Sequence, residues 1–159
     1  MSLQVANSKN MSFKITPKFS AKQIRQMLQE RLKNVDDAIF LALKRAGEEF
    51  VAHARANGNY KDQTGNLRSS IGYIILLNGR QLTENFEGKN SEGVEFARRT
   101  ADNLKKNHPR GYVLIGVAGM SYAAAVESKG YDVITSSAQQ TAASLTAAMK
   151  RIELKQKTI

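Results

Sequence analysis

The sequence predicts an α+β domain in which a small antiparallel or mixed β-sheet packs against a long N-terminal helix, with another helix at the C-terminus. Three observations lead to this prediction. A helical apolar stripe runs through residues 28–50, strand-like apolar runs occupy residues 71–77 and 112–117, and a last helical pattern follows residue 137. Strands and helices do not alternate as a regular βαβ repeat, which favours α+β over a doubly wound α/β fold.

The N-terminal part of the chain begins with residues 1–11, which we expect to be a flexible leader to a single domain over residues 12–159. Alternating apolar and polar residues over 12–16 predict a short strand. Ser20 and Gln23 have the spacing of a capping box, so a long helix should begin there and end at Asn57-Gly58-Asn59. The apolar stripe that this helix should lay on the sheet is Leu28, Leu32, Val35, Ile39, Ala42, Ala46 and Phe50.

The middle of the chain holds the two strongest strand signals. The run 71–77 is bounded by Asn78-Gly79, which predicts a core strand followed by a turn. Residues 78–93 are polar and are expected to form a mobile loop or a hairpin. A helical pattern over 94–107 could be an insertion, and the second strand follows at 112–117.

The C-terminal part is predicted to contain three further elements. Residues 122–127 should form a short helical turn, and residues 131–134 a last short strand. Ser137 and Gln140 have the spacing of a capping box, which would begin the final helix.

The composition limits the possible functions. The chain of 159 residues contains no cysteine, which excludes disulfides and thiolate metal sites. No apolar run approaches the ~18 residues of a transmembrane helix, so a cytosolic protein without a membrane partner is expected. The net charge of +10 suggests a polyanionic partner. Since the basic residues are spread along the chain, we expect solvated helix faces and only non-specific contact with DNA.

The segment T-G-N-L-R-S-S-I at residues 64–71 has the composition of a phosphate-binding loop but the wrong context. A P-loop follows a strand and opens a helix, whereas here a helix precedes and a strand follows. The segment is therefore interpreted as a turn. Gly65 would adopt a positive φ angle, and Leu67 and Ile71 would anchor the turn in the core. Arg68 would form an ion pair, either on the surface or across a subunit boundary.

No catalytic, cofactor-binding or metal-binding residue is predicted. His53 and His108 are the only histidines and fall in different predicted elements. The sequence lacks the spacings of zinc sites and of serine-hydrolase motifs. In the segment 121–130, packing accounts for every residue except Glu127. That acid could pair with Arg68, which makes Arg68 and Glu127 the candidate interface residues.

Taken together, two segments resemble a family of bacteriophage proteins. The family is that of the tail-completion, or head–tail joining, proteins of long-tailed phages and prophages. Its members show a long first helix, a T-G-x-L-x-x-S-I segment, a strand ending in V-G, and Y-A-x-x-V-E-x-G. The resemblance covers about residues 20–152, but Ser128-Lys129 and residues 131–134 depart from the family pattern. The matching residues are Thr64, Gly65, Leu67, Ser70, Ile71, Tyr122, Ala123, Val126, Glu127 and Gly130.

This resemblance implies a non-enzymatic structural protein without a cofactor. It would form a ring oligomer that joins the phage connector to the tail-tube proteins, first in the cytoplasm of the bacterial host during assembly and then in the virion. DNA would pass through the bore, where a basic subunit suits a passing polyanion.

Two other functions are compatible with the residues. A basic nucleic-acid-binding module is supported by the net charge and by Tyr73, Tyr112 and Tyr131, which could stack on bases if exposed. A toxin-like or nuclease-like enzyme is supported only by size and basicity.

Overall fold

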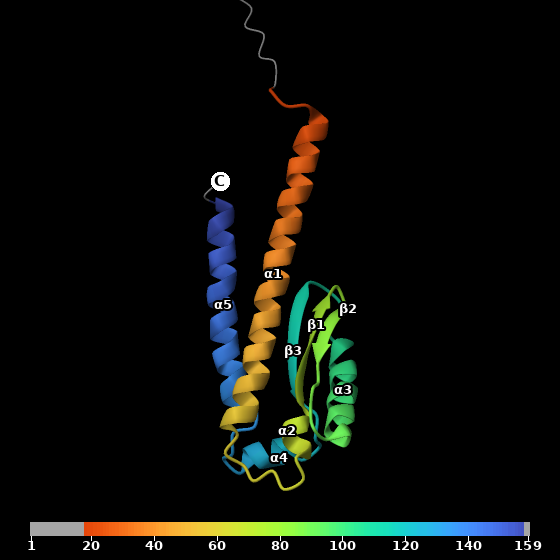
Figure 1. Cartoon of the computed structure of the whole chain (residues 1–159), viewed down its shortest axis with the longest axis vertical. Coiled ribbons are helices and arrows are strands. Elements are labelled where there is room, and N and C mark those ends of the chain that lie inside the picture. The colour runs from red at the N-terminus through yellow and green to blue at the C-terminus, as the bar shows by residue number, and fades with distance from the viewer. Residues whose placement is uncertain (1–17, 158–159) are drawn as a thin grey trace, which may run out of the picture. The chain divides into compact units, whose positions relative to one another are not determined.

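The computed structural model describes residues 18–157, and there the predicted α+β class is confirmed (Figure 1). The leader and the strand predicted at 12–16 lie outside the described residues. The chain divides into two compact units, residues 1–34 and 35–159. Among residues 18–157, no helix combines the length and the apolar character needed to span a bilayer.

The described part of the first unit is the beginning of helix α1, Ala21–Asn57. Its predicted capping box is confirmed, because the Ser20 amide donates to Gln23 Oε1 at 2.8 Å and the Gln23 amide donates to Ser20 Oγ at 3.2 Å. The predicted apolar stripe is only partly right. Leu28 and Leu32 are 56% and 65% exposed. The rest of the stripe lies in the second unit, where Val35, Ile39 and Ala42 are partly buried and Ala46 and Phe50 are buried.

The second unit contains a three-stranded antiparallel sheet in the order β2-β1-β3. Its strands are β1, Ile71–Leu77, β2, Arg80–Asn85, and β3, Tyr112–Ala118. Asn78 and Gly79 join β1 to β2 with φ angles of 51° and 76°. Two positive φ angles are what a two-residue hairpin turn of type I′ requires, and Asn-Gly adopts them readily. The segment 78–93, predicted to be a mobile loop or a hairpin, therefore has a hairpin as far as Asn85, followed by a loop and the start of α3 at Ser91.

Helices cover both faces of the sheet (Figure 1). On one face, Ile71, Tyr73 and Ile75 pack with α1 and with α5, Thr135–Lys157. On the other face, Ile74 and Leu76 pack with α3, Ser91–Lys105. Because β1 is covered on both sides, it is a continuous apolar run rather than an alternating one.

Helix α3 approaches the sheet closely and begins three residues before its predicted start. The Asn90 side chain caps it by accepting a hydrogen bond from the Glu92 amide at 3.0 Å. Ala97 and Ala101 are fully buried against the sheet. A Cβ atom on Gly119 would lie 2.3 Å from the Ala97 backbone nitrogen, so this close approach requires glycine.

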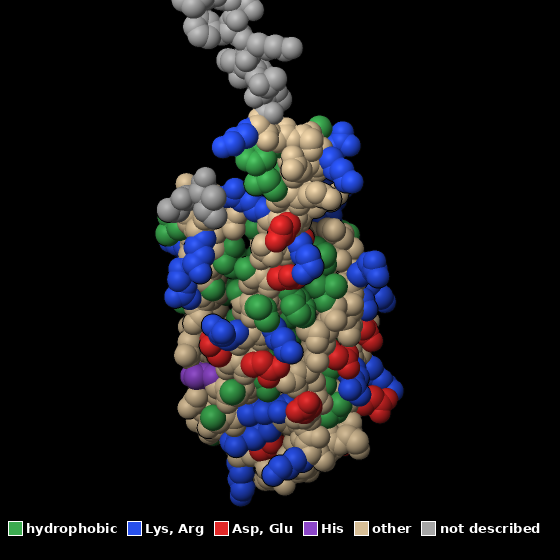
Figure 2. All heavy atoms as spheres, turned by 45° about the horizontal axis from the view of Figure 1, so that its top comes forward, with side chains coloured by type: hydrophobic (Ala, Val, Ile, Leu, Met, Phe, Trp, Pro, Cys, Tyr) green, Lys and Arg blue, Asp and Glu red, His purple; other side chains and the backbone are tan. Residues whose placement is uncertain are grey.

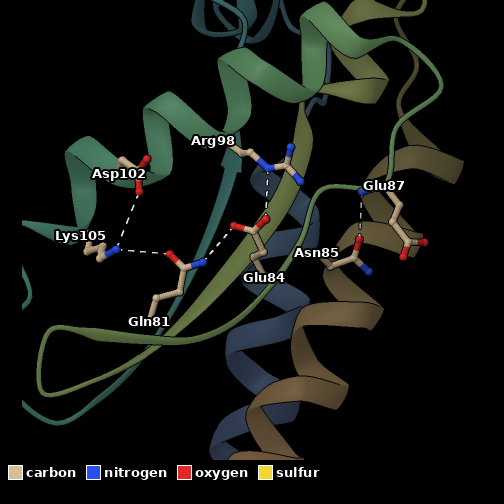
Figure 3. A network of polar contacts seen from close by, with 7 residues as sticks. All are labelled: Gln81, Glu84, Asn85, Glu87, Arg98, Asp102 and Lys105. Atoms are coloured by element: carbon tan, nitrogen blue, oxygen red, sulfur yellow. Dashed lines mark hydrogen bonds and ion pairs between the residues drawn. The ribbon is translucent and has the colours of Figure 1, made fainter.

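The edge strand β2 is polar, and two of its side chains, Gln81 and Glu84, bond to α3 (Figure 3). A register shift in the pairing of β1 with β2 leaves Leu82 as an extra residue, which lets Gln81 and Glu84 both reach toward α3. Arg98 Nε lies 3.1 Å from Glu84 Oε1, and Lys105 Nζ donates to Gln81 at 3.4 Å. Such a charged, bulged edge is poorly suited to pairing with another strand.

Two C-terminal predictions are wrong. Residues 131–134 form no strand, since the amides of residues 133 and 134 donate to the Glu127 carboxylate instead of to a neighbouring strand. Helix α5 begins at Thr135, so Ser137 lies inside the helix and does not cap it. Ser137 is buried, and its hydroxyl shares a hydrogen bond of 2.7 Å with His53 Nδ1 on α1.

Candidate functional site

The T-G-N-L-R-S-S-I segment forms a turn and the one-turn helix α2, Asn66–Ser69, directly before β1. Gly65 has a φ angle of 76°, as predicted. The Asn66 amide donates to Thr64 Oγ1 at 3.3 Å. The Arg68 amide donates to Asp62 Oδ2 at 3.1 Å, a contact that sequence reasoning missed because Asp62 lies outside the recognised motif.

Ser70 connects this segment to the second one. The side chain is fully buried, and its hydroxyl donates to the Leu67 carbonyl at 2.8 Å and accepts from the Met120 amide at 3.4 Å. The Ser70 carbonyl accepts from the Gly119 amide at 3.0 Å. The chain that enters α4, Ala123–Ser128, is therefore bonded to the turn that enters β1.

Apolar packing joins the same two segments. Leu67 and Ala123 are buried in one cluster, with Val126 packed at its margin. Tyr122, which we expected to pack closely, is 40% exposed. Partial burial and the negative charge of Asp62 raise the pKa of Tyr122 against the opposing effect of its hydrogen bond with Thr64. The motif residues of both segments thus form one structural unit at the end of the sheet.

Glu127 caps helix α5. Its Oε1 atom accepts hydrogen bonds from the amides of Val133, Ile134 and Thr135 at 3.3, 2.9 and 3.0 Å, and from the Thr135 hydroxyl at 2.9 Å. Partial burial opposes ionisation, but these hydrogen bonds outweigh it and leave the pKa of Glu127 below its usual range. Gly130, with a φ angle of 87°, lies in the turn that brings the chain back over the carboxylate.

The pairing of Arg68 with Glu127 that the sequence allows is not found, since no ion pair joins them among residues 18–157. The carboxylate instead binds backbone amides at the start of a helix, where the partial positive charge favours an anion. Arg68 donates from Nη2 to the Gly58 carbonyl at 3.1 Å, and its guanidinium lies 5.4 Å from the centre of the Tyr60 ring.

Arg68 and Arg55 line a recess of about 570 Å³ beside the turn, together with Ser69, Gly88 and Lys89. Arg55 donates to the carbonyls of Glu87 and Ile71 at 2.6 and 2.8 Å. Burial lowers the pKa of Arg55, although the negative charges of Glu87 and Glu48 oppose this effect. Both arginines are thus held by backbone carbonyls. Sequence reasoning missed Arg55, because an arginine in the last turn of a helix is ordinary.

The two histidines and one of the three candidate stacking tyrosines have the following surroundings. His53 is bonded to Ser137, and His108 lies in the exposed turn after α3. Within residues 18–157 there is no group of three or more acidic or histidine side chains placed to hold a metal ion. Of the three tyrosines considered for base stacking, Tyr73 is buried, and its hydroxyl donates to Glu48 at 2.7 Å.

Comparison with family models, with curated proteins and with solved structures gives no match to the chain.

Proposed function

We propose that this protein is a non-enzymatic structural component of a long-tailed phage or prophage, which forms a ring at the junction of the head and the tail. The subunit would bind copies of itself, the connector on one side and the tail-tube protein on the other. It would act in the host cytoplasm during assembly and remain in the virion.

The observation that carries the proposal is the contact between the two family-like segments. Residues 64–71 and 121–130 are distant in sequence, yet Ser70 bonds the end of the first to the residues that enter the second. Leu67 and Ala123 bury their side chains in the same cluster. Motif residues that meet in one unit support a common structural origin, whereas unrelated matches to common residues need not lie together.

The unit suits a subunit of an assembly. The Gly119 and Met120 amides bond to Ser70 within the unit, so a neighbouring subunit could bind this surface without first ordering these segments. Arg68 lies at the rim of the recess and is a candidate for contact across a subunit boundary. In a ring, one surface of each subunit must meet a different surface of the next.

The proposal is tested by deleting the gene from the phage or prophage that carries it and examining the lysate by electron microscopy. We expect filled heads and separate tails, with joined particles restored by a plasmid copy of the gene. Normal virions from the deletion strain would contradict the proposal.

A matched pair of variants tests the role of Arg68 in the same assay. Arg68→Ala should fold but restore few joined particles, whereas Lys61→Ala, which removes an exposed cation nearby, should restore them fully. Thermal unfolding of both purified variants separates a lost interface from a lost fold.

A further inference from the structure

An apolar groove runs between helices α1 and α5 in the second unit. Its lining includes Leu41 and Ala42 of α1 and Ala148, Ile152 and Leu154 of α5, around a volume of about 590 Å³. Leu41 and Leu154 are 62% and 61% exposed, so the walls of the groove are largely uncovered. Side chains this apolar and this exposed, gathered in one hollow, are typical of a binding surface.

The groove continues along both helices. A second hollow shares Ala42, Arg45, Ala148 and Arg151 with the first and extends to Ser144. Together they follow residues 38–49 of α1 and 144–155 of α5. At 1.5 Å per residue each stretch is about 17 Å long, or three helical turns.

Basic side chains border this groove. Arg45, Arg151 and Lys155 line the first hollow, which has no acidic residue among its described lining. No ion pair within residues 18–157 involves these three side chains, whereas Arg98 and Lys157 do pair with acids. The continuing hollow contains one acid, Glu49. In Figure 2, Lys and Arg side chains gather over α5 beside apolar ones.

The shape of the groove favours a helix as its occupant. Two helices with alanines at positions 38, 42 and 148 leave room for a third helix to approach closely. An amphipathic helix would place its apolar side between Leu41 and Leu154 and its polar side toward the basic rim. Complementarity with three unpaired cations requires that this polar side be acidic.

A second copy of this chain is a poor occupant. The other exposed apolar stripe among the described residues belongs to the beginning of α1, with Ile24, Met27 and Leu28. Residues 18–34 carry five Lys or Arg against a single acid, Glu30. Bringing this basic segment to a basic rim would place like charges together, which disfavours association.

We propose that the groove between α1 and α5 binds an acidic amphipathic helix of a partner protein. This inference does not depend on the proposed phage function, because it uses only the lining and the charges of the groove.

The test uses the full-length protein and a labelled synthetic helix of about 18 residues, five turns long, with leucines along one side and glutamates along the other. Fluorescence anisotropy should show saturable binding that weakens as the salt rises from about 50 to about 500 mM. A peptide with lysine in place of every glutamate should bind at least about tenfold more weakly.

Charge reversal locates the site. Arg45→Glu/Arg151→Glu should weaken binding of the glutamate peptide at least about tenfold and strengthen binding of the lysine peptide. Lys106→Glu/Lys129→Glu changes the net charge equally at exposed positions away from the groove and should leave binding almost unchanged. Leu41→Ser should weaken binding of both peptides, because it removes an apolar wall.

Three outcomes would overturn the inference. The first is an equal loss of binding in the two double variants, and the second is an equal affinity for the two peptides. The third is tighter binding to a 20-base-pair DNA duplex, or to vesicles of anionic phosphatidylglycerol, than to the glutamate peptide, if that binding is lost in Arg45→Glu/Arg151→Glu. The last result would assign the surface to a nucleic acid or a membrane. Unfolding curves of each variant confirm that it is folded.

Discussion

Gly47→Ala should destabilise the protein, although the same change usually strengthens a helix. Gly47 lies in the interior of α1, where alanine is favoured over glycine by about 1 kcal/mol. A Cβ atom at this position would lie 2.6, 2.7 and 2.8 Å from three ring carbons of Tyr73. Carbon atoms in contact are normally about 3.5–4.0 Å apart, so the ring must move by about 1 Å.

Tyr73 has little room to make this movement. It is 1% exposed on the central strand, and its hydroxyl donates to Glu48, whose carboxylate also accepts from Asn85 Nδ2 at 2.8 Å. Overpacking costs about 1–3 kcal/mol, and weakening the hydrogen bond costs up to about 1.5 kcal/mol. After the helix-propensity gain is subtracted, the net loss is about 2 kcal/mol, or a fall in Tm of about 4–8 °C for a chain of this size.

The assay is thermal and urea unfolding followed by circular dichroism. Ala52→Gly, at an exposed site in the same helix, measures the propensity term alone and should cost about 1 kcal/mol. In a Tyr73→Leu background the ring is absent, so Gly47→Ala should become neutral or stabilising, with a coupling energy of about 2–3 kcal/mol. If Gly47→Ala raised the Tm of the otherwise unchanged protein, the reasoning from the Tyr73 contact would be refuted.

Three further predictions concern the candidate site and the charge. Glu127→Gln should lower stability at pH 7 by about 1–2 kcal/mol, because the charged acceptor at the start of α5 is lost. The pKa of Glu127 is lowered in the folded state. Its contribution to stability is therefore fully present above the unfolded pKa of ~4.3 and is lost as the pH falls through the folded pKa. Unfolding curves of the variant and the parent should accordingly converge in acid. Ser70→Ala should lower the free energy of unfolding, measured in urea, by about 1–3 kcal/mol, because it removes a buried hydroxyl that bonds two backbone groups. Ser144→Ala, at an exposed site, should change it little. Binding to duplex DNA should be weak, similar for different sequences and steeply reduced by salt. A preference for one sequence of more than about tenfold, ~1.4 kcal/mol, would favour the nucleic-acid-binding alternative.

The main elements of the fold could be predicted because each has a local signal. The apolar run 71–77 and the Asn78-Gly79 turn predict a strand and its hairpin, and the structure has both. The prediction failed at residues 131–134, whose tyrosine, valine and isoleucine are typical of a strand. In the structure the amides of residues 133 and 134 donate to the Glu127 carboxylate and are not available to a neighbouring strand. Residue composition does not reveal such a contact.

The candidate site was less predictable, because its contacts join distant residues. Gly65 could be assigned a positive φ from its place in a turn. The contact between Ser70 and Met120, 50 residues apart, has no periodic pattern that would reveal it. The contacts of Arg55 were equally unpredictable, because its partners are backbone carbonyls, which every residue has and which the residue types therefore do not reveal.

The separation between Ser70 and Met120 also has a consequence for the order of folding. The hairpin of β1 and β2 closes over a two-residue turn, and such hairpins form within about 1–10 μs. Pairing of β1 with β3 must first close the chain over residues 78–111, which carries a larger entropic cost and makes this step slower. The contacts of Ser70 with Gly119 and Met120 lie just beyond β3, so we infer that they form late. A chain that has made only its hairpin lacks these two contacts, so its turn at residues 64–71 is not yet joined to the residues that enter α4.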